Sequence, residues 1–398
     1  MTHSGRTVRR TVGAVAVAGA LTAVAAAPAA ATPGGYTTPG GSGRPAHAAT
    51  RTAMEQALRS SGLPGVIATT VDADGSWSAA VGVADTTTGR PRSARERFRI
   101  GSVTKPFIAT VVLQLQAEGR LDLDDTVERW LPGLVSGHGN DGSAVTVRQL
   151  LNHTSGVFDY GDDPAMGAVL FTPAFLARRY DTYRPEQLVR IALAHPPVFA
   201  PGTSYQYSNT NYLLAGMIIE RVTGRPYGEE VERRIIRPLG LTGTSVPGTT
   251  TALPRPHARG YSTLFGGSAT PLDVTELNPS MAGSAGGMVS STADLTRFLS
   301  ALMRGQLLPP AELDEMTAPG PHGSGGLGIG SGTLSCGVTL WGHDGGIHGS
   351  STLALTTRDG RHVLALNTNA DWFRDKLPLA EAEFCGRPAD QGRPDRPD

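Results

Sequence analysis

The sequence predicts an α+β fold in which an antiparallel sheet is assembled from both ends of the chain and a helical region is inserted between its strands. Segments with strand patterns lie near both ends, whereas the apolar periodicity of the middle is helical. A sheet with helices packed against it satisfies both patterns. With 398 residues, the chain can bury the core of one large fold.

The strands are predicted from short runs of apolar and β-branched residues that end at turn signals. One hairpin turns at Asp72-Ala73-Asp74-Gly75 and a later one at Asp359-Gly360, which is a strong hairpin signal. The expected strands are residues 66–71, 77–83, 338–342, 351–357 and 362–367. Helices are predicted where apolar residues recur every three or four positions and a glycine follows, at residues 107–115, 211–222 and 291–303.

Residues 1–31 have the form of an export signal. Three arginines precede an apolar run, and Ala29-Ala30-Ala31 fits a cleavage site. The Arg9-Arg10 pair leaves the Sec and twin-arginine routes both open, and an uncleaved anchor is the alternative to cleavage. We expect a secreted protein with no stable membrane anchor after processing, a flexible linker at 32–50 and a disordered tail at 387–398.

Cys336 and Cys385 are the only cysteines of the chain. Two cysteines in an exported chain favour one disulfide, and closing that loop of about 50 residues contributes about 4 kcal/mol in the chain-entropy model. A reactive thiol is the alternative, and neither cysteine has a sequence context that favours it.

Charge and composition argue against two classes of partner. Lys+Arg and Asp+Glu both total 35, so we expect neither nucleic acid nor an anionic membrane surface as a partner. Only two basic residues are lysines, Lys105 and Lys376. Lysine can lose its proton inside a protein and arginine cannot, so a lysine is a candidate for acid–base chemistry. We attribute Lys376 to chance.

The first motif is Ser102-Val103-Thr104-Lys105, which follows a strand-like run and opens an apolar helix. Pro106 fits the first turn of that helix, and the spacing places Ser102 and Lys105 on one face, about 5–6 Å apart at Cβ. A neutral Lys105 could accept the serine proton, and the positive end of the helix would favour an alkoxide. Alone, this spacing more often marks an N-capping serine and a surface lysine.

The second motif is Tyr207-Ser208-Asn209, just before a predicted helix. Its phenol can relay a proton, and its amide can orient a substrate carbonyl or the lysine. A packed Tyr207 and a helix-capping Asn209 are the alternative interpretation.

The third motif, His343-Asp344-Gly345, stands at the end of a predicted strand and is followed by Gly346. A strand edge can pair with a peptide-like substrate, and the two glycines permit close backbone approach. His343 would face the nucleophile as a polar or cationic group. The alternatives are a glycine-rich bulge and a metal site of His343, Asp344 and His348, but no closed ligand set supports the metal.

Together, and in this order, the three motifs resemble those of the serine beta-lactamase and penicillin-binding-protein superfamily. The chain is most similar to actinobacterial secreted D-alanyl-D-alanine carboxypeptidases, over residues 51–386. Further similar segments are Phe98-Arg99-Ile100-Gly101, Leu151-Asn152-His153-Thr154-Ser155-Gly156, Ser284-Ala285-Gly286-Gly287, Ser290-Ser291-Thr292, Leu334-Ser335-Cys336-Gly337 and Glu383-Phe384-Cys385-Gly386.

The resemblance implies a two-lobed fold with terminal helices flanking the sheet, a helical lobe inserted at about 120–284, and the site in the cleft between. It implies that Ser102 is acylated, that Lys105 and Tyr207 share the proton transfers, and that Asn209 positions the acyl amide. His343 would act as the third motif's basic residue, and the backbone N–H groups of Ser102 and Gly346 would form the oxyanion hole. The implied partner is a small peptide or a beta-lactam, with no metal or cofactor, and we expect a monomer.

The substrate grip departs from the family pattern. The carboxypeptidases hold the substrate carboxylate with an arginine before the Leu-Ser-Cys-Gly segment, but this chain has Gly328-Ile329-Gly330-Ser331-Gly332 there. The middle of the third motif is Asp344, an anion that would repel a carboxylate unless another cation compensates.

Several functions therefore stay open beside the carboxypeptidase. An esterase, a beta-lactamase, a D-peptidase, or a D-aminopeptidase in which Asp344 holds a substrate amine would keep the same nucleophile. A non-catalytic cell-wall binding module would not need all of these residues. A Ser-His-Asp hydrolase is disfavoured because the sequence contains no G-x-S-x-G.

Overall fold

The computed structural model describes residues 47–386 except 269 and 324. The predicted export signal and tail, and residues 32–46 of the predicted linker, lie outside the described residues. The predicted end of the linker at Thr50 is wrong, because the first helix, α1, spans Ala48–Ser60. Thr50, Ala53, Met54 and Ala57 recur at helical spacing and are all buried, so this segment belongs to the folded unit.

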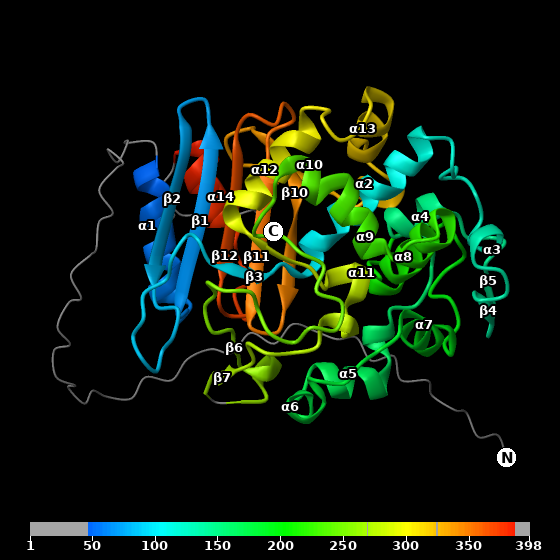
Figure 1. Ribbon diagram of the computed structural model, residues 1–398, viewed down its shortest axis with the longest axis horizontal. Coiled ribbons are helices and arrows are strands. Elements are labelled where there is room, and N and C mark those ends of the chain that lie inside the picture. Colours follow the sequence, from blue (N-terminus) through cyan, green and yellow to red (C-terminus); the bar gives the residue numbers. More distant parts are fainter. Residues whose placement is uncertain (1–46, 269, 324, 387–398) are drawn as a thin grey trace, which may run out of the picture. The chain divides into compact units, whose positions relative to one another are not determined.

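The predicted antiparallel sheet is confirmed. It has six strands in the order β2-β1-β12-β11-β10-β9, so strands from the two ends of the chain pair at its centre (Figure 1). Its strands are β1 (Gly65–Asp72), β2 (Gly75–Gly82), β9 (Gly330–Thr333), β10 (Thr339–Ile347), β11 (Ser350–Thr356) and β12 (Val363–Thr368).

Two predictions about this sheet are corrected. β9 was not expected as a strand, because its Gly-Ser-Gly-Thr sequence carries no apolar pattern, yet it pairs with Thr339–Gly342. The strand predicted at 338–342 continues through the third motif to Ile347, because Gly345 and Gly346 pair with β11 opposite Thr352 and Ser351. The two consecutive glycines had favoured a strand end in the prediction from the sequence.

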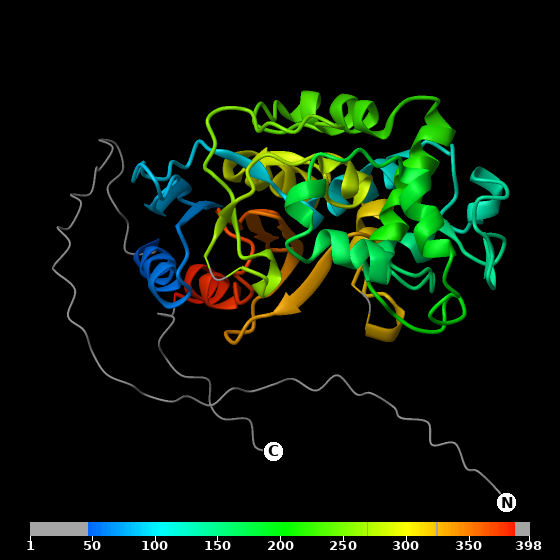
Figure 2. The ribbon, with the colours of Figure 1, turned by 90° about the horizontal axis from the view of Figure 1, so that it is seen from below.

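Helices cover both faces of the sheet, so its central strands are apolar on both sides. Val66 and Leu366 face α1 and α14, whereas the neighbouring Ile67 and Ala365 face the larger core that contains α2 and α12. Figure 2 shows α1 (blue) beside α14 (red), and these two helices are in contact. The first and last described helices are thus packed together on one face of the sheet.

The helical region, which excludes α1 and α14, lies on the other face of the sheet and beyond one of its edges. The longer helices are α1 (Ala48–Ser60), α2 (Thr104–Ala117), α7 (Pro185–Leu193), α8 (Asn209–Thr223), α12 (Thr292–Met303), α13 (Pro310–Thr317) and α14 (Leu377–Cys385). The shorter ones are α3 (Val127–Trp130), α4 (Val147–Leu151), α5 (Pro164–Leu170), α6 (Phe175–Arg178), α9 (Tyr227–Val231), α10 (Arg237–Leu239) and α11 (Gly283–Gly286).

Short ribbons complete the fold. They pair β3 (Arg97–Arg99) with β8 (Val289–Ser291), β4 (Ser136–Gly137) with β5 (Asn140–Asp141), and β6 (Tyr261–Ser262) with β7 (Leu272–Asp273). The first ribbon matters most for the site, because β3 leads directly into the turn that carries Ser102. Within the described ranges, no helix combines the length and the apolar character needed to cross a bilayer.

A buried carboxylate joins the first and last described helices. Glu383 of α14 accepts hydrogen bonds from Thr50 of α1 (2.6 Å), Thr70 of β1 (2.7 Å) and His362 (2.8 Å). His47 lies 3.4 Å from the same carboxylate. Burial raises the pKa of Glu383, but these donors outweigh burial and lower the pKa to about 2. The carboxylate is therefore a charged clamp between α1, β1 and α14.

Candidate active site

Ser102 lies in a 3₁₀ turn, Gly101–Val103, that runs from β3 into α2. Pro106 falls in the first turn of α2, as the sequence predicted, where its missing N–H costs no hydrogen bond. Ser102 and Lys105 therefore project from the same end of the helix, and Lys105 Nζ lies 3.1 Å from Ser102 Oγ.

The amine of Lys105 is fully buried and has three oxygen neighbours. Besides Ser102, they are Asn209 Oδ1 at 2.9 Å and the carbonyl oxygen of Ala285 at 2.8 Å. A neutral amine has two N–H donors and one lone pair. If its two donors go to Asn209 and Ala285, the lone pair is left to accept the Ser102 proton.

Electrostatics favour that neutral form. Burial lowers the pKa of Lys105 to about 7, and the carboxylates of Asp159 and Asp344 raise it only in part. Near neutral pH, a substantial fraction of the amine is therefore unprotonated and available as a base.

Tyr207 donates a second hydrogen bond to Ser102 Oγ, at 2.7 Å. Burial raises the pKa of its phenol well above the usual value, so the phenol keeps its proton at neutral pH. His153 stacks on the Tyr207 ring with ring centres 4.3 Å apart, and its Nδ1 accepts the backbone N–H of Ser208 at 3.2 Å. This packing holds the phenol over the serine.

Asn209 opens α8 and is oriented by Asp159. Asp159 Oδ2 accepts both the backbone N–H (2.8 Å) and the side-chain Nδ2 (2.9 Å) of Asn209. Because the amide nitrogen is committed to Asp159, the amide oxygen points at Lys105. Asp159 is 6% exposed, so this anion is buried beside the reacting groups.

The edge of β10 lies against the nucleophile turn. A Cβ on Gly101 would come within 2.8 Å of Gly346 N, and one on Gly345 within 3.0 Å of Ser102 N. Only glycines permit this approach, and Gly101 also has a φ of +53°. The backbone N–H groups of Ser102 and Gly346 are thereby neighbours, as an oxyanion hole requires.

His343 and Asp344 lie on opposite faces of β10, because successive strand residues alternate. The His343 ring is 6.4 Å from the Tyr207 ring, centre to centre. Burial, with the charge of Lys105, lowers the pKa of His343 to about 4. Of the two options that the sequence left open, the neutral polar group therefore fits and the cation does not. Asp344 lies on the other face, and Lys376 Nζ is 3.7 Å from its carboxylate.

A hollow of about 230 Å³ opens beside Ser102. Its apolar lining residues are Leu170, Phe171, Phe265, Met281 and Ile347. Phe171 and Phe265 are each 44% exposed and meet edge to face, with ring centres 5.0 Å apart. Asp371 and Arg374, from the segment after β12, also line the hollow. It can therefore receive an apolar side chain next to a charged wall.

The structure brings together the predicted residues Ser102, Lys105, Tyr207, Asn209 and the Gly345-Gly346 backbone. Sequence reasoning missed four contributors: Asp159, His153, Arg374 and Lys376. Asp159 and Arg374 carried no local signal, and His153 was noted only as part of a similar segment. Lys376 did carry a signal, since it is one of only two lysines in the sequence, but its presence was attributed to chance.

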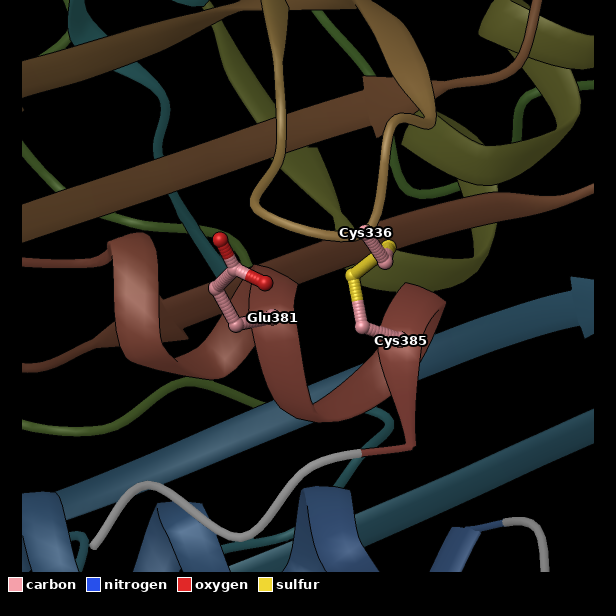
Figure 3. Close-up of side chains that lie close together, drawn as sticks. All are labelled: Cys336, Glu381 and Cys385. Carbon is pink, nitrogen blue, oxygen red and sulfur yellow. A yellow bond between two sulfur atoms is a disulfide. The ribbon is translucent and has the colours of Figure 1, made fainter. Parts of the chain in front are cut away.

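The disulfide lies elsewhere. Cys336, in the turn between β9 and β10, is bonded to Cys385 at the end of α14, as predicted. Within the described part of the chain, Cys336, Cys385 and Glu381 are the metal-ligating side chains that gather closely enough to share an ion (Figure 3). Both sulfurs are in the disulfide, and Glu381 accepts hydrogen bonds from Ser335, so this group has no free thiolate to offer. His348, of the alternative metal set, instead stacks on Phe175.

The arrangement can carry out acyl transfer. It holds a serine nucleophile, a buried amine able to take its proton, a phenol able to return a proton, and two backbone N–H donors for a developing oxyanion.

Comparison with known proteins agrees with this chemistry. A family model described as Beta-lactamase matches residues 50–383. D-stereospecific amidohydrolase from Streptomyces sp. is 54% identical with a TM-score of 0.81, covering 86% of this chain and 99% of that one. D-amino acid amidase from Ochrobactrum anthropi SV3 is 30% identical with a TM-score of 0.70, covering 81% and 90%. Penicillin-binding protein 4* of Bacillus subtilis is 29% identical over 79% of this chain and 70% of its own length.

The family match spans the sheet, the helical region and every residue of the Ser102 cluster. This chain therefore belongs to the Beta-lactamase family, as a hydrolase of the superfamily that includes the penicillin-binding proteins.

Proposed function

We propose that the protein hydrolyses D-aminoacyl amides, that is, amides of D-amino acids and peptides that begin with a D-residue, through an acyl-enzyme on Ser102. The observation that carries the proposal is the charge of the third motif, where Lys376 Nζ lies 3.7 Å from the Asp344 carboxylate, so that this pair offers no uncompensated cation to a terminal carboxylate. An amidase needs no cation for a terminal carboxylate, whereas a carboxypeptidase does. The D configuration is inferred from the named activity of the Streptomyces and Ochrobactrum relatives.

The proton transfers follow from the hydrogen bonds. Neutral Lys105 takes the Ser102 proton while Oγ bonds to the amide carbon, and the N–H groups of Ser102 and Gly346 hold the oxyanion. Tyr207 then protonates the leaving nitrogen and regains a proton from Lys105 as the C–N bond breaks. Water then attacks the ester carbon and gives a proton to Lys105. The bond between Ser102 Oγ and the acyl carbon breaks, Lys105 returns the proton to Oγ, and the D-amino acid is released.

The hollow beside Ser102 supports an apolar acyl side chain. The lining includes Gly346, Ile347 at the end of β10 and the following His348. In this proposal the hollow receives the side chain of the acyl residue. Aromatic walls at Phe171 and Phe265 favour aromatic and large aliphatic residues.

The test compares D-phenylalanine amide with its L enantiomer, using purified wild type and Ser102→Ala. We expect ammonia release from the D form, at least about 10-fold less from the L form, and a loss of about 10³-fold or more in the variant. A folded wild type that releases no ammonia from D-phenylalanine amide would sink the proposal.

A D-alanyl-D-alanine carboxypeptidase that recognises penicillins is the second candidate. It is favoured by Arg374, a cationic residue that lines the hollow beside Ser102, and by the likeness to penicillin-binding protein 4*. Its test is release of free D-alanine from an acylated peptide ending in D-Ala-D-Ala. Release by wild type but not by Ser102→Ala, with no turnover of D-phenylalanine amide, would make this the activity instead.

A further inference from the structure

Asp344 has a basic partner that the sequence did not reveal. Lys376 Nζ lies 3.7 Å from Asp344 Oδ2, and their side chains are 9% and 68% exposed. Asp344 stands on the face of β10 that also carries Leu340, which packs against Ala380 of α14. Lys376 immediately precedes α14, so the helix delivers its amine to that face.

The position of Lys376 is fixed by the segment that leads to α14. Ser351 Oγ donates to the carbonyl of Phe373 at 3.0 Å, and Gly349 N donates to Asp371 Oδ2 at 3.1 Å. Both bonds tie the segment to β11 and to the turn that precedes it. A lysine with a side chain 9% exposed differs from an ordinary surface lysine, whose amine moves freely in water. The ion pair is therefore a built feature of the site.

The pair lies on the leaving-group side of the serine. Gly346 supplies the oxyanion donor, and the hollow for the acyl group begins at Ile347 and His348, one direction along β10. Asp344 lies two residues in the other direction, about 7 Å away at the rise of a strand. With the acyl side chain in the hollow, the departing amine extends in the direction of Asp344, whose carboxylate raises the pKa of Lys105 and of Tyr207.

We propose that the Asp344–Lys376 pair is a leaving-group subsite that selects between neutral and anionic leaving groups. Lys376 alone would attract the free carboxylate of a departing amino acid, and Asp344 alone would repel it. In the pair, the two charges nearly cancel. The enzyme therefore cleaves substrates with a neutral leaving group and substrates with an anionic leaving amino acid with similar kcat/KM. The inference rests on the proposed function, because it concerns substrates that share a D-aminoacyl group.

The experiment measures a ratio: kcat/KM for D-phenylalanyl-glycine divided by kcat/KM for D-phenylalanine amide, at one pH. Both substrates meet the same free enzyme, so changes in the ionisation of Lys105 cancel in the ratio. Asp344→Asn should raise the ratio by about 3–10-fold, and Lys376→Met should lower it by a similar factor. The double variant should return the ratio to within about twofold of wild type, as expected for a coupled pair.

Two controls separate charge from folding. Lys376→Arg keeps the charge and should leave the ratio within about twofold of wild type. Asp314→Asn removes a similarly exposed carboxylate from a different ion pair, with Arg358, and should leave the ratio unchanged. A ratio that stays constant in both single variants, or moves in the same direction in both, while D-phenylalanine amide is still cleaved, overturns the subsite. If wild type cleaves neither substrate, the proposed function itself fails and the subsite fails with it.

Discussion

Lys105 and Glu383 are both buried ionisable groups, on opposite faces of one sheet, yet burial has opposite consequences for them. Lys105 is surrounded by the oxygens of Ser102, Asn209 and Ala285, all uncharged. The effect of burial is the largest influence at this site, and the pKa of Lys105 falls to about 7. Glu383 is surrounded by donors, two of them histidines, and its pKa falls to about 2 although burial opposes the charge.

The difference shows how one fold uses buried charge in two ways. Neutral partners leave the Lys105 proton free to move, which catalysis requires. Donors that all favour the anion keep Glu383 charged at neutral pH, which suits a clamp between α1, β1 and α14. Lys105 and Glu383 have similar numbers of polar contacts. The charge of the partners, and whether they donate or accept hydrogen bonds, therefore decides whether the buried group can exchange its proton or stays charged.

The largest expected effect tests whether the Lys105 proton must leave. Lys105→Arg retains a cation but cannot give up its proton at neutral pH, so we expect kcat/KM to fall by about 10³-fold or more. Because arginine is bulkier, Lys105→Met serves as a second variant and should be equally inactive. The melting temperature of each variant establishes that it is folded. Substantial activity in either folded variant would show that Lys105 is not the base.

The second effect concerns stability. Glu383→Gln should lower the free energy of unfolding by about 3 kcal/mol at pH 7, because a pKa lowered from 4.5 to about 2 contributes that much. The folded-state pKa is the lower one, so this contribution is complete above about pH 4.5 and is lost as the pH falls toward 2. Urea unfolding of wild type and variant from pH 7 to pH 3 should show that the difference between their free energies of unfolding decreases as the pH falls.

The matched control for Glu383 is Glu381→Gln, in the same helix. The Glu381 carboxylate accepts two hydrogen bonds from exposed Ser335 and should be worth about 1 kcal/mol or less. Neither substitution should change kcat/KM by more than about twofold, since neither residue touches the Ser102 cluster. Equal stability losses in the two variants would contradict the clamp.

The smallest expected effect refines the Lys105 environment. The Asp159 charge raises the pKa of Lys105, so Asp159→Asn should lower that pKa and move the acid limb of kcat/KM to lower pH. Activity on the plateau should fall about 10-fold, because Asn209 loses a charged anchor. The measurement is a pH profile from pH 5 to pH 9, with Asp162→Asn as the neighbouring control. An acid limb that moves to higher pH would reverse the assignment.

Local pattern was enough to predict much of the fold and the nucleophile. The S-x-x-K spacing followed by Pro106 is a property of a single helix end, and the alternating strands of the terminal hairpins are equally local. The hairpin at Asp359-Gly360 formed as predicted, between β11 and β12. β9 could not be predicted in this way, because its pairing with β10 and not its own composition makes it a strand.

The surroundings of the nucleophile depend on contacts between distant segments. Asp159 meets Asn209 from 50 residues away, and Lys376 reaches Asp344 only because α14 packs beneath β10. No pattern within a short window contains such information. From the sequence, Asp344 was expected to repel a substrate carboxylate unless another cation compensates, and Lys376 Nζ lies 3.7 Å from this carboxylate.

The pairing of early and late elements of the described chain has a consequence for how the molecule reaches its folded state. β1 pairs with β12 although about 300 residues separate them, and β12 is followed only by α14 among the described elements. The central pairing of the sheet thus waits for nearly the whole folded unit to be synthesised, which predicts slow, late assembly around a helical region able to form earlier. Conversely, since His47 touches Glu383, a short peptide joining residue 47 to residue 386 should permit new ends in an exposed turn, and such a circular permutant would place the central strands next to each other along the chain.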